Sequence, residues 1–245
     1  MPKEEREVRK TVTVLFADVA GSTSLGERLD PESLRQIMTR YFDVARTALE
    51  RHGGTVEKFI GDAVMAVFGV PAMHEDDALR AARAAIDLRE GVVRLNQELQ
   101  AAFGACLQVR TGINTGEVVA GDPAAGESFV SGDIVNVAAR LEQAAQPDEI
   151  LIGAQTLRLL RDAVRVEPVE PLTLKGKPGP VSAFQLLEVL PGEPALARRL
   201  DSPMVGRKAE LRRLSEAFDR VERQSACQLV TLVGVAGVGK TRLVR

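Results

Sequence analysis

The sequence has few of the residues that several classes of function require. It contains no Trp and one Tyr, and aromatic residues make up 4% of its 245 positions. Single-stranded nucleic acids are commonly bound by stacking their bases on aromatic rings, so such a surface is not expected. The formal net charge is −2, and both signs are mixed along the chain. We therefore predict no direct nucleic-acid partner and no attraction to an anionic membrane through bulk charge.

Cysteine and histidine are also scarce. Cys106 and Cys227 are far apart, and each lies beside an apolar run, which is typical of reduced thiols buried in a core. His52 and His74 do not combine with them into a spacing typical of zinc sites. We expect two buried free thiols and no zinc cluster.

Long apolar runs are missing. The longest candidate covers residues 63–70 and ends at Pro71, well short of the roughly 18 residues that a membrane-spanning helix needs. The charged N-terminal residues 1–10 lack the apolar stretch of a signal peptide. We predict a cytoplasmic protein with no membrane partner. The hydrophobic content of 45% is sufficient for a packed core.

Segments of strand and helix character are interleaved over the first 190 residues. Asp30 as N-cap and Pro31 at the first helical position mark the start of one helix, which His52-Gly53-Gly54 ends. This interleaving predicts an α+β domain whose sheet is covered on one face by helices. Strands are predicted at 11–16, 55–59, 63–68, 107–114, 117–121, 149–152, 164–174 and 181–189, with hairpin turns at Ile60-Gly61-Asp62 and Thr115-Gly116, and further helices at 76–102, 133–145 and 154–161.

A Pro- and Gly-containing segment at 191–194 marks a domain boundary. We divide the chain into a tail (1–9), a first domain (10–190), a linker (191–203) and a second domain (204–245). In the second domain, a helix near 210–223 and a strand at 228–233 precede a glycine-rich loop.

That loop reads Gly234-x-x-x-x-Gly239-Lys240-Thr241. After an apolar strand this pattern is typical of a P-loop, in which loop amides, a lysine and a magnesium-binding hydroxyl hold phosphates. Residues 204–245 resemble the start of an AAA-like signalling ATPase module. Because no acidic strand and little of a sheet follow, we expect a truncated α/β domain that does not hydrolyse ATP itself.

Two acidic residues stand where predicted strands end. Asp18 follows the apolar run 11–16, and Asp62 lies in the predicted turn between residues 59 and 63. Two carboxylates held rigidly at strand ends can share metal ions, and oxygen ligands suit Mg²⁺ or Mn²⁺. Taken alone, each residue also has the simpler interpretation of a turn or capping aspartate.

Polar residues on the helix at 133–145 form a second candidate group. Asn136 and Arg140 are four residues apart and share one helical face. Lys175 precedes a glycine in the loop 174–177, where the backbone can approach a ligand closely. The simpler interpretation of these residues is an exposed helix surface and a charged loop.

Taken in order, these motifs resemble the catalytic domain of class III nucleotidyl cyclases, over roughly residues 10–190. The resemblance implies a ferredoxin-like (palm-like) α+β fold that works as a head-to-tail homodimer. It also implies the reaction: the ribose 3′-hydroxyl of ATP attacks the α-phosphate and yields 3′,5′-cyclic AMP and pyrophosphate. A diguanylate cyclase is not indicated, because its Gly-Gly-Asp/Glu-Glu-Phe loop is missing from the hairpin at 59–62.

The resemblance assigns the metal site to one protomer. Asp18 and Asp62, with the backbone carbonyl of Val19, would hold two Mg²⁺ or Mn²⁺ ions. Amides of the turn that leads to Thr23 would contact phosphate oxygens. The partner protomer would supply the contacts to base, ribose and phosphate.

Those contacts fall on four residues. Asn136 would orient the ribose, and Arg140 would stabilise the charge that grows on the α-phosphate in the transition state. Lys58 would read the purine, where a lysine favours adenine, and Lys175 would contact the β- and γ-phosphates.

Phe129 departs from the family pattern. The family usually has Asp or Thr at this position as the second purine selector, and phenylalanine cannot accept a hydrogen bond from adenine. Phe129 therefore leaves open a degenerate cyclase domain that binds nucleotide as a sensor. The ATPase-like segment leaves open a second alternative, a regulatory module of a larger ATPase or transcriptional regulator.

Overall fold

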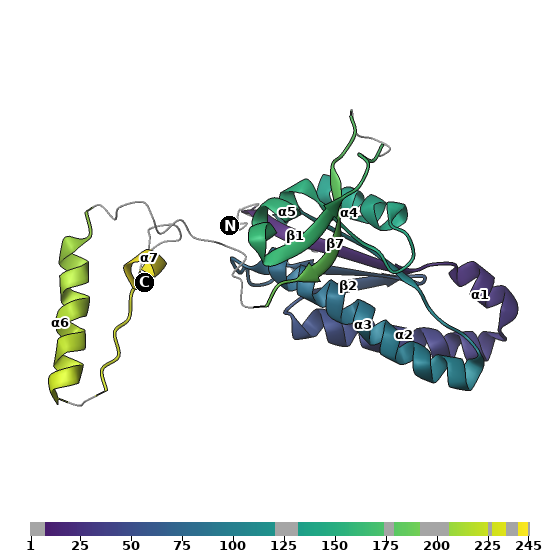
Figure 1. The fold of residues 1–245 in the computed structure, drawn as a ribbon, viewed down its shortest axis with the longest axis horizontal. Coiled ribbons are helices and arrows are strands. Elements are labelled where there is room, and N and C mark those ends of the chain that lie inside the picture. Colours follow the sequence, from purple (N-terminus) through teal and green to yellow (C-terminus); the bar gives the residue numbers. More distant parts are fainter. Residues whose placement is uncertain are drawn as a thin grey trace, which may run out of the picture. The chain divides into compact units, whose positions relative to one another are not determined.

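The computed structural model describes residues 8–120, 132–173, 179–191, 206–224, 227–233 and 240–244. It divides into two compact units, residues 1–197 and 198–245. Among its described residues, the first unit contains the seven strands of one sheet and five α-helices (Figure 1).

The sheet of the first unit is mixed. Its strand order is β2-β3-β1-β4-β5-β7-β6, in which β4 and β5 are parallel and all other neighbours are antiparallel. The central strands β1 and β4 are the longest and pair along their whole lengths. The strands are β1 (Val8–Val19), β2 (Thr55–Ile60), β3 (Ala63–Phe68), β4 (Val109–Ala120), β5 (Ile150–Gly153), β6 (Val164–Pro168) and β7 (Ala183–Val189).

The helices begin and end close to the residues that the sequence indicates. Asp30 caps α2 by accepting hydrogen bonds from the backbone amides of Glu32 and Ser33, at 3.1 and 2.9 Å, with Pro31 as the first helical residue. The α-helices of this unit are α1 (Ser22–Arg28), α2 (Pro31–Arg51), α3 (Asp77–Phe103), α4 (Asp133–Ala144) and α5 (Ala154–Leu160).

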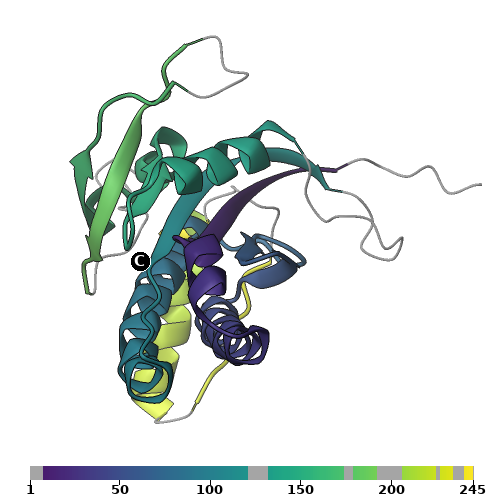
Figure 2. The same ribbon diagram turned by 90° about the vertical axis from the view of Figure 1, so that its right-hand side faces the viewer.

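Helices cover both faces of the sheet, which corrects the expectation of one covered face. The main core cluster joins one face of the sheet to α2 and α3, with contributions from Leu157 and Leu160 of α5. A second cluster lies on the opposite face, where Ile134 and Ala138 of α4 pack on β1, β3 and β4. Figure 2 shows α4 and the pair α2 and α3 on opposite sides of the sheet.

The expected hairpin at Thr115-Gly116 is wrong, because β4 continues through both residues. Thr115 pairs with Thr13 in the ladder, and its buried hydroxyl lies 2.9 Å from Thr13 Oγ1 and 3.1 Å from Thr156 Oγ1. A Cβ added to Gly116 would lie 2.6 Å from Ile134 Cγ2. The glycine thus makes room for α4 and does not mark a turn.

Two other expectations about this unit need correction. The strand expected at 11–16 is longer, since β1 runs from Val8 to Val19, and α1 begins soon after it, at Ser22. The strand expected at 164–174 ends at Pro168, and only an isolated bridge between Leu172 and Val181 follows within the described residues.

The expectation of buried cysteines is also wrong, because Cys106 and Cys227 are both exposed. After α3, Ala105 and Leu107 are buried, and Cys106 between them faces solvent. There the thiol donates to Gln100 Oε1 at 3.2 Å.

The second unit contains α6 (Lys208–Gln224) and α7 (Lys240–Val244) among its described residues. Residues 227–233 form no strand, contrary to the expected strand at 228–233. Leu229 and Val233 are 91% and 92% exposed there, so the apolar run has no sheet partner to stabilise it. None of the helices that the structure describes is both long and apolar enough to cross a bilayer.

Candidate active site

Asp18 lies at the end of β1 on the face that α4 covers, because side chains alternate along the strand and Phe16 packs on that face. Directly opposite, on β4, stands Arg110. Arg110 Nη2 donates a hydrogen bond to Asp18 Oδ2 over 2.6 Å. Asp18 is therefore engaged by a guanidinium in this structure.

Glu142 is the third charged member of this cluster. It reaches down from α4, is 5% exposed, and places Oε1 3.1 Å from Arg110 Nη2. This ion pair lacks hydrogen-bond geometry, and Oε1 has no hydrogen-bond partner among the described residues. Neither Glu142 nor Arg110 is among the site residues predicted from the sequence. The available signal was a Glu four residues after Ala138, on the helical face that also carries the apolar core residues.

Close packing of α4 on β4 brings Glu142 to this place. A Cβ added to Gly112 would lie 2.3 Å from both the carbonyl oxygen of Ala138 and the amide nitrogen of Glu142. Only a residue without a side chain allows the helix backbone to approach the strand so closely. Gly112 thus sets the height of α4 above the sheet.

The environment shifts the acidity of these groups. Burial raises the pKa of Asp18, and the Asp62 charge adds to this rise, while the Arg110 hydrogen bond opposes it. Burial, followed by the Asp18 charge, raises the pKa of Glu142 to about 7. Burial likewise raises the pKa of Tyr41, whose hydroxyl lies 3.5 Å from the Ala17 carbonyl oxygen on the other face of the sheet.

Asp62 lies in the turn between β2 and β3, after Gly61, which has a positive φ of 62°. The negative charge of Asp62 contributes to the raised pKa of Asp18. The fold therefore brings Asp18 and Asp62 within electrostatic range of each other, although they are 44 positions apart in the chain. Lys58, on the same hairpin, is paired with Met65 in the ladder and is exposed.

Asn136 and Arg140 lie on a different face of α4 from Glu142. At 100° per residue, Arg140 is about 200° around the helix axis from Glu142. Asn136 is exposed, whereas Arg140 is half-buried and forms no ion pair with any described residue. These two residues consequently do not face the carboxylate cluster of their own chain.

The remaining predicted residues vary in what can be described. Val19 ends β1 with a buried side chain, and Thr23 is exposed in α1, not in a turn. The amide of Ala20 donates to the Gln108 carbonyl at 2.8 Å and is not free for phosphate. Lys240 begins α7. Phe129, Lys175, Gly234, Gly239 and the side chain of Thr241 lie outside the described residues.

The donor set near Asp18 suits a hard divalent cation. Asp18 and Asp62 offer only carboxylate oxygens, which Mg²⁺ and Mn²⁺ prefer, and the Glu142 oxygen without a hydrogen bond lies in the same cluster. No group of three or more His, Cys, Asp and Glu residues forms a preassembled metal site within the described part of the chain. These residues are therefore suitable ligands for Mg²⁺ or Mn²⁺. In this structure Asp18 is hydrogen-bonded to Arg110 instead.

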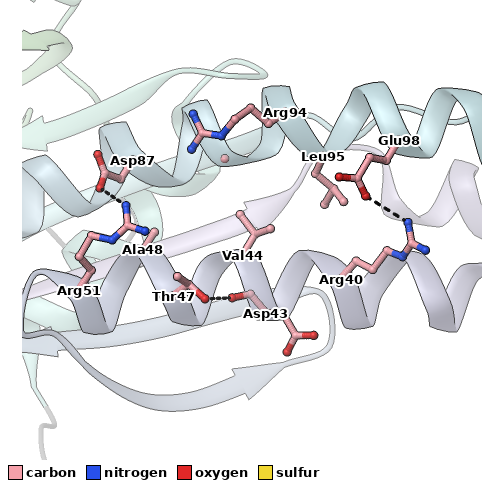
Figure 3. Close-up of a pocket in the computed structure, with 11 residues that line it drawn as sticks. Arg40, Asp43, Val44, Thr47, Ala48, Arg51, Asp87, Arg94, Leu95 and Glu98 are labelled. Carbon is pink, nitrogen blue, oxygen red and sulfur yellow. Dashed lines mark hydrogen bonds and ion pairs between the residues drawn. The ribbon is translucent and has the colours of Figure 1, made fainter.

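A separate groove of about 510 Å³ lies between α2 and α3 (Figure 3). Its three arginines all pair with carboxylates: Arg40 with Glu98 at 3.5 Å, Arg51 with Asp87 at 3.3 Å and Arg94 with Glu90 at 3.8 Å. Gly91 allows close approach there, because an added Cβ would lie 2.7 Å from Val44 Cγ1. The groove is thus a charge-balanced helix crossing and contains none of the predicted site residues.

Comparison with known proteins locates this arrangement among the cyclases. Residues 4–188 match the model of the adenylate and guanylate cyclase catalytic domain, and residues 203–245 match that of the AAA ATPase domain. The adenylyl cyclase CyaB from P. aeruginosa is 33% identical with a TM-score of 0.69, covering 78% of this chain and 97% of that chain. The guanylyl cyclase Cya2 is 32% identical with a TM-score of 0.69, covering 76% and 96%.

Curated relatives are longer than this chain. Adenylate cyclase 1 of Rhizobium meliloti is 28% identical over 74% of this chain, which corresponds to 28% of that protein. An uncharacterized protein of Mycobacterium tuberculosis is 38% identical over 72% of this chain and 41% of its own length. The chain therefore spans less than half of the length of these relatives. It belongs to the adenylate and guanylate cyclase family and carries a class III cyclase catalytic domain followed by a partial AAA ATPase domain.

Proposed function

We propose that this chain is an adenylyl cyclase that forms 3′,5′-cyclic AMP and pyrophosphate from ATP. The observation that carries the proposal is the electrostatic interaction of Asp18, near the end of β1, with Asp62, in the β2–β3 turn, beside a guanidinium that pairs with Asp18. Carboxylates on rigid backbone are what a two-metal phosphoryl-transfer site requires.

In this proposal Asp18 and Asp62, with the Val19 carbonyl, hold two Mg²⁺ or Mn²⁺ ions. Bound there, the ions supply activation of the ribose 3′-hydroxyl and neutralisation of the triphosphate charge. The chain's own contribution is rigidity: β1 is paired on both sides, and Asp18 lies within its ladder with β4. The backbone that carries Asp18 therefore needs little reorganisation on loading.

Asn136 and Arg140 would act on substrate across a homodimer interface. They lie on the face of α4 that turns away from Glu142 and the carboxylate cluster, so a second copy of the chain would bring its own Asp18 and Asp62 to them. Arg140 has no ion-pair partner among the described residues, which leaves its guanidinium available for an α-phosphate.

Lys58 supports adenine as the base. It is exposed on β2, four residues before Asp62, where its ammonium can donate to adenine N1. Resemblance does not separate the two substrates, because the adenylyl and guanylyl cyclases compared above have the same TM-score. The proposed choice of ATP thus rests on this lysine.

The proposal is tested by measuring cyclic AMP and cyclic GMP formed from ATP and GTP, with Mg²⁺ and with Mn²⁺. Cyclic AMP should form in the wild type and fall by at least about 1000-fold in Asp62→Asn, as expected for loss of metal-assisted chemistry. The matched control is Asp43→Asn on the exposed side of α2, which should retain full activity. Cyclic GMP as the main product would contradict the role of Lys58.

A nucleotide-binding sensor without turnover is the second candidate. It is favoured by Phe129 at the position of the second purine selector and by the engagement of Asp18 with Arg110. ATP binding to a dimeric sample that forms no cyclic nucleotide would support this candidate and exclude the first.

A further inference from the structure

Arg110 lies between two carboxylates that it contacts unequally. Its Nη2 donates a hydrogen bond to Asp18 Oδ2 over 2.6 Å, whereas the same nitrogen lies 3.1 Å from Glu142 Oε1 without hydrogen-bond geometry. Arg110 Nε and Glu142 Oε1 are both buried with no hydrogen-bond partner among the described residues. A donor and an acceptor thus remain unused in side chains that already touch.

This arrangement is unusual because buried polar atoms are nearly always hydrogen-bonded in folded proteins. Both atoms are buried, so leaving them without a hydrogen bond costs free energy of folding. The unused pair therefore indicates that the cluster has a second arrangement, in which Arg110 donates to Glu142.

Glu142 is the fixed partner in such an exchange. It lies on α4, whose backbone packs closely against β4 at Gly112. A Cβ added to Gly112 would lie 2.3 Å from the amide nitrogen of Glu142. Arg110 is the adjustable partner, since its long side chain has several rotatable bonds and is 26% exposed. A rotation of the guanidinium alone can transfer its hydrogen bond from Asp18 to Glu142.

We propose that Glu142 is a positioning residue that receives the Arg110 guanidinium when Asp18 ligates a divalent cation. This inference rests on the proposed metal-binding role of Asp18 and Asp62. Arg110 and a cation compete for the same carboxylate, so Asp18 becomes available only when Arg110 moves away. Glu142 offers Arg110 a buried acceptor nearby, and the neutral Arg110–Glu142 pair does not repel the incoming cation.

The test is a double-mutant cycle on the binding of Mn²⁺ in the absence of nucleotide. Binding is measured from the electron paramagnetic resonance signal of the free ion. No nucleotide is needed, because one protomer carries all four side chains involved: Asp18, Asp62, Arg110 and Glu142. Glu142→Gln should weaken Mn²⁺ binding about tenfold, because Arg110 then remains on Asp18; this is within the coupling range of contacting residues. In an Arg110→Met background, the same Glu142→Gln change should alter binding by less than about threefold.

Other outcomes overturn the inference. Equal weakening in both backgrounds would mean that Glu142 contacts the cation itself, and no weakening in either would mean that it does not receive Arg110. Glu98→Gln on the exposed surface of α3 is the matched control and should bind Mn²⁺ like the wild type. If Asp62→Asn leaves binding unchanged, the metal site itself is wrong and the inference falls with it.

A crystal structure of the wild-type chain with Mn²⁺ gives a test that needs no variant. Arg110 should donate to Glu142 and no longer to Asp18 when Mn²⁺ is on Asp18. An Arg110 that still hydrogen-bonds Asp18 beside the bound ion would refute the exchange.

Discussion

Arg110 and Asp18 face each other across the central β1–β4 ladder and are joined by a 2.6 Å hydrogen bond. The guanidinium supplies the positive charge beside carboxylates whose ionisation is opposed by burial. Asp18, Asp62 and Glu142 repel one another, and Arg110 is the cation that pairs with two of them. The stability of the chain and the state of its proposed metal site are therefore linked through one side chain.

We predict that Arg110→Met destabilises the metal-free chain by about 3–5 kcal/mol, because the buried carboxylates lose their counter-ion. Adding Mn²⁺ or Mg²⁺ should recover much of this loss, since a divalent cation on Asp18 and Asp62 restores positive charge. The measurement is urea unfolding of both proteins with and without metal.

The control for this prediction is Arg94→Met. Arg94 is 66% exposed and lies 3.8 Å from Glu90, so its pair should contribute less than about 1 kcal/mol. Equal unfolding midpoints for wild type and Arg110→Met would show that Arg110 is not the counter-ion of the cluster.

We predict that Gly112→Ala lifts α4 from the sheet. The added methyl group would meet backbone atoms of Ala138 and Glu142 at 2.3 Å, and backbone cannot rotate away as a side chain can. The expected cost is about 1–3 kcal/mol of stability. Cyclase activity should fall by about 100-fold, because Asn136 and Arg140 move with the helix.

Thermal melts and cyclic AMP assays check this prediction. Gly179→Ala is the matched control, since nothing lies within 4 Å of its added Cβ and it is exposed. Retention of full activity in Gly112→Ala would mean that the height of α4 does not matter for substrate contacts.

Much of the fold could be predicted from local signals in the sequence. The start of α2 was predictable because Asp30 and Pro31 act through bonds within one helical turn, and the β2–β3 hairpin because apolar runs flank Gly61-Asp62. The interaction of Asp18 with Asp62 was expected from their positions at predicted strand ends together with the family resemblance, since neither local sequence alone shows which strand ends lie near each other.

The predictions from sequence failed where a residue's role depends on a tertiary contact. Gly116 resembles a turn residue, but it is required by the side chain of Ile134 on α4. Glu142 appears as one more charged helix residue until α4 is packed on β4 and Arg110 is found beneath it. No sequence period reveals which helix covers which face of a sheet.

We predict that Glu142→Gln makes the stability of the chain less dependent on pH. Burial raises the pKa of Glu142 from 4.5 to about 7, so between these values the folded chain binds a proton that the unfolded chain has lost. Stability from this group therefore falls as pH rises through that window, and the cost is fully present above it. Glutamine has no charge and removes the cost.

Urea unfolding at two pH values measures the effect. Relative to the wild type, Glu142→Gln should be more stable at pH 8 than at pH 5. The change in this relative unfolding free energy should be roughly 1–3 kcal/mol. Glu98→Gln, at a site where the side chain is 70% exposed, should show no such shift. The same difference at both pH values would contradict the assignment of Glu142 as a carboxyl whose ionisation burial opposes.

We predict the opposite pH dependence for the cap of α2. Hydrogen bonds from Ser33 and Glu32 lower the pKa of Asp30 below 3.8, so its contribution is present at neutral pH and lost as pH falls through the folded-state pKa. Asp30→Ala should therefore lower the melting temperature at pH 7 and have a smaller effect near pH 2. Asp30→Asn keeps a capping oxygen without the charge and should restore most of the stability at both pH values. A penalty of the same size for Asp30→Ala at both pH values would mean that the charged carboxylate adds nothing to the cap.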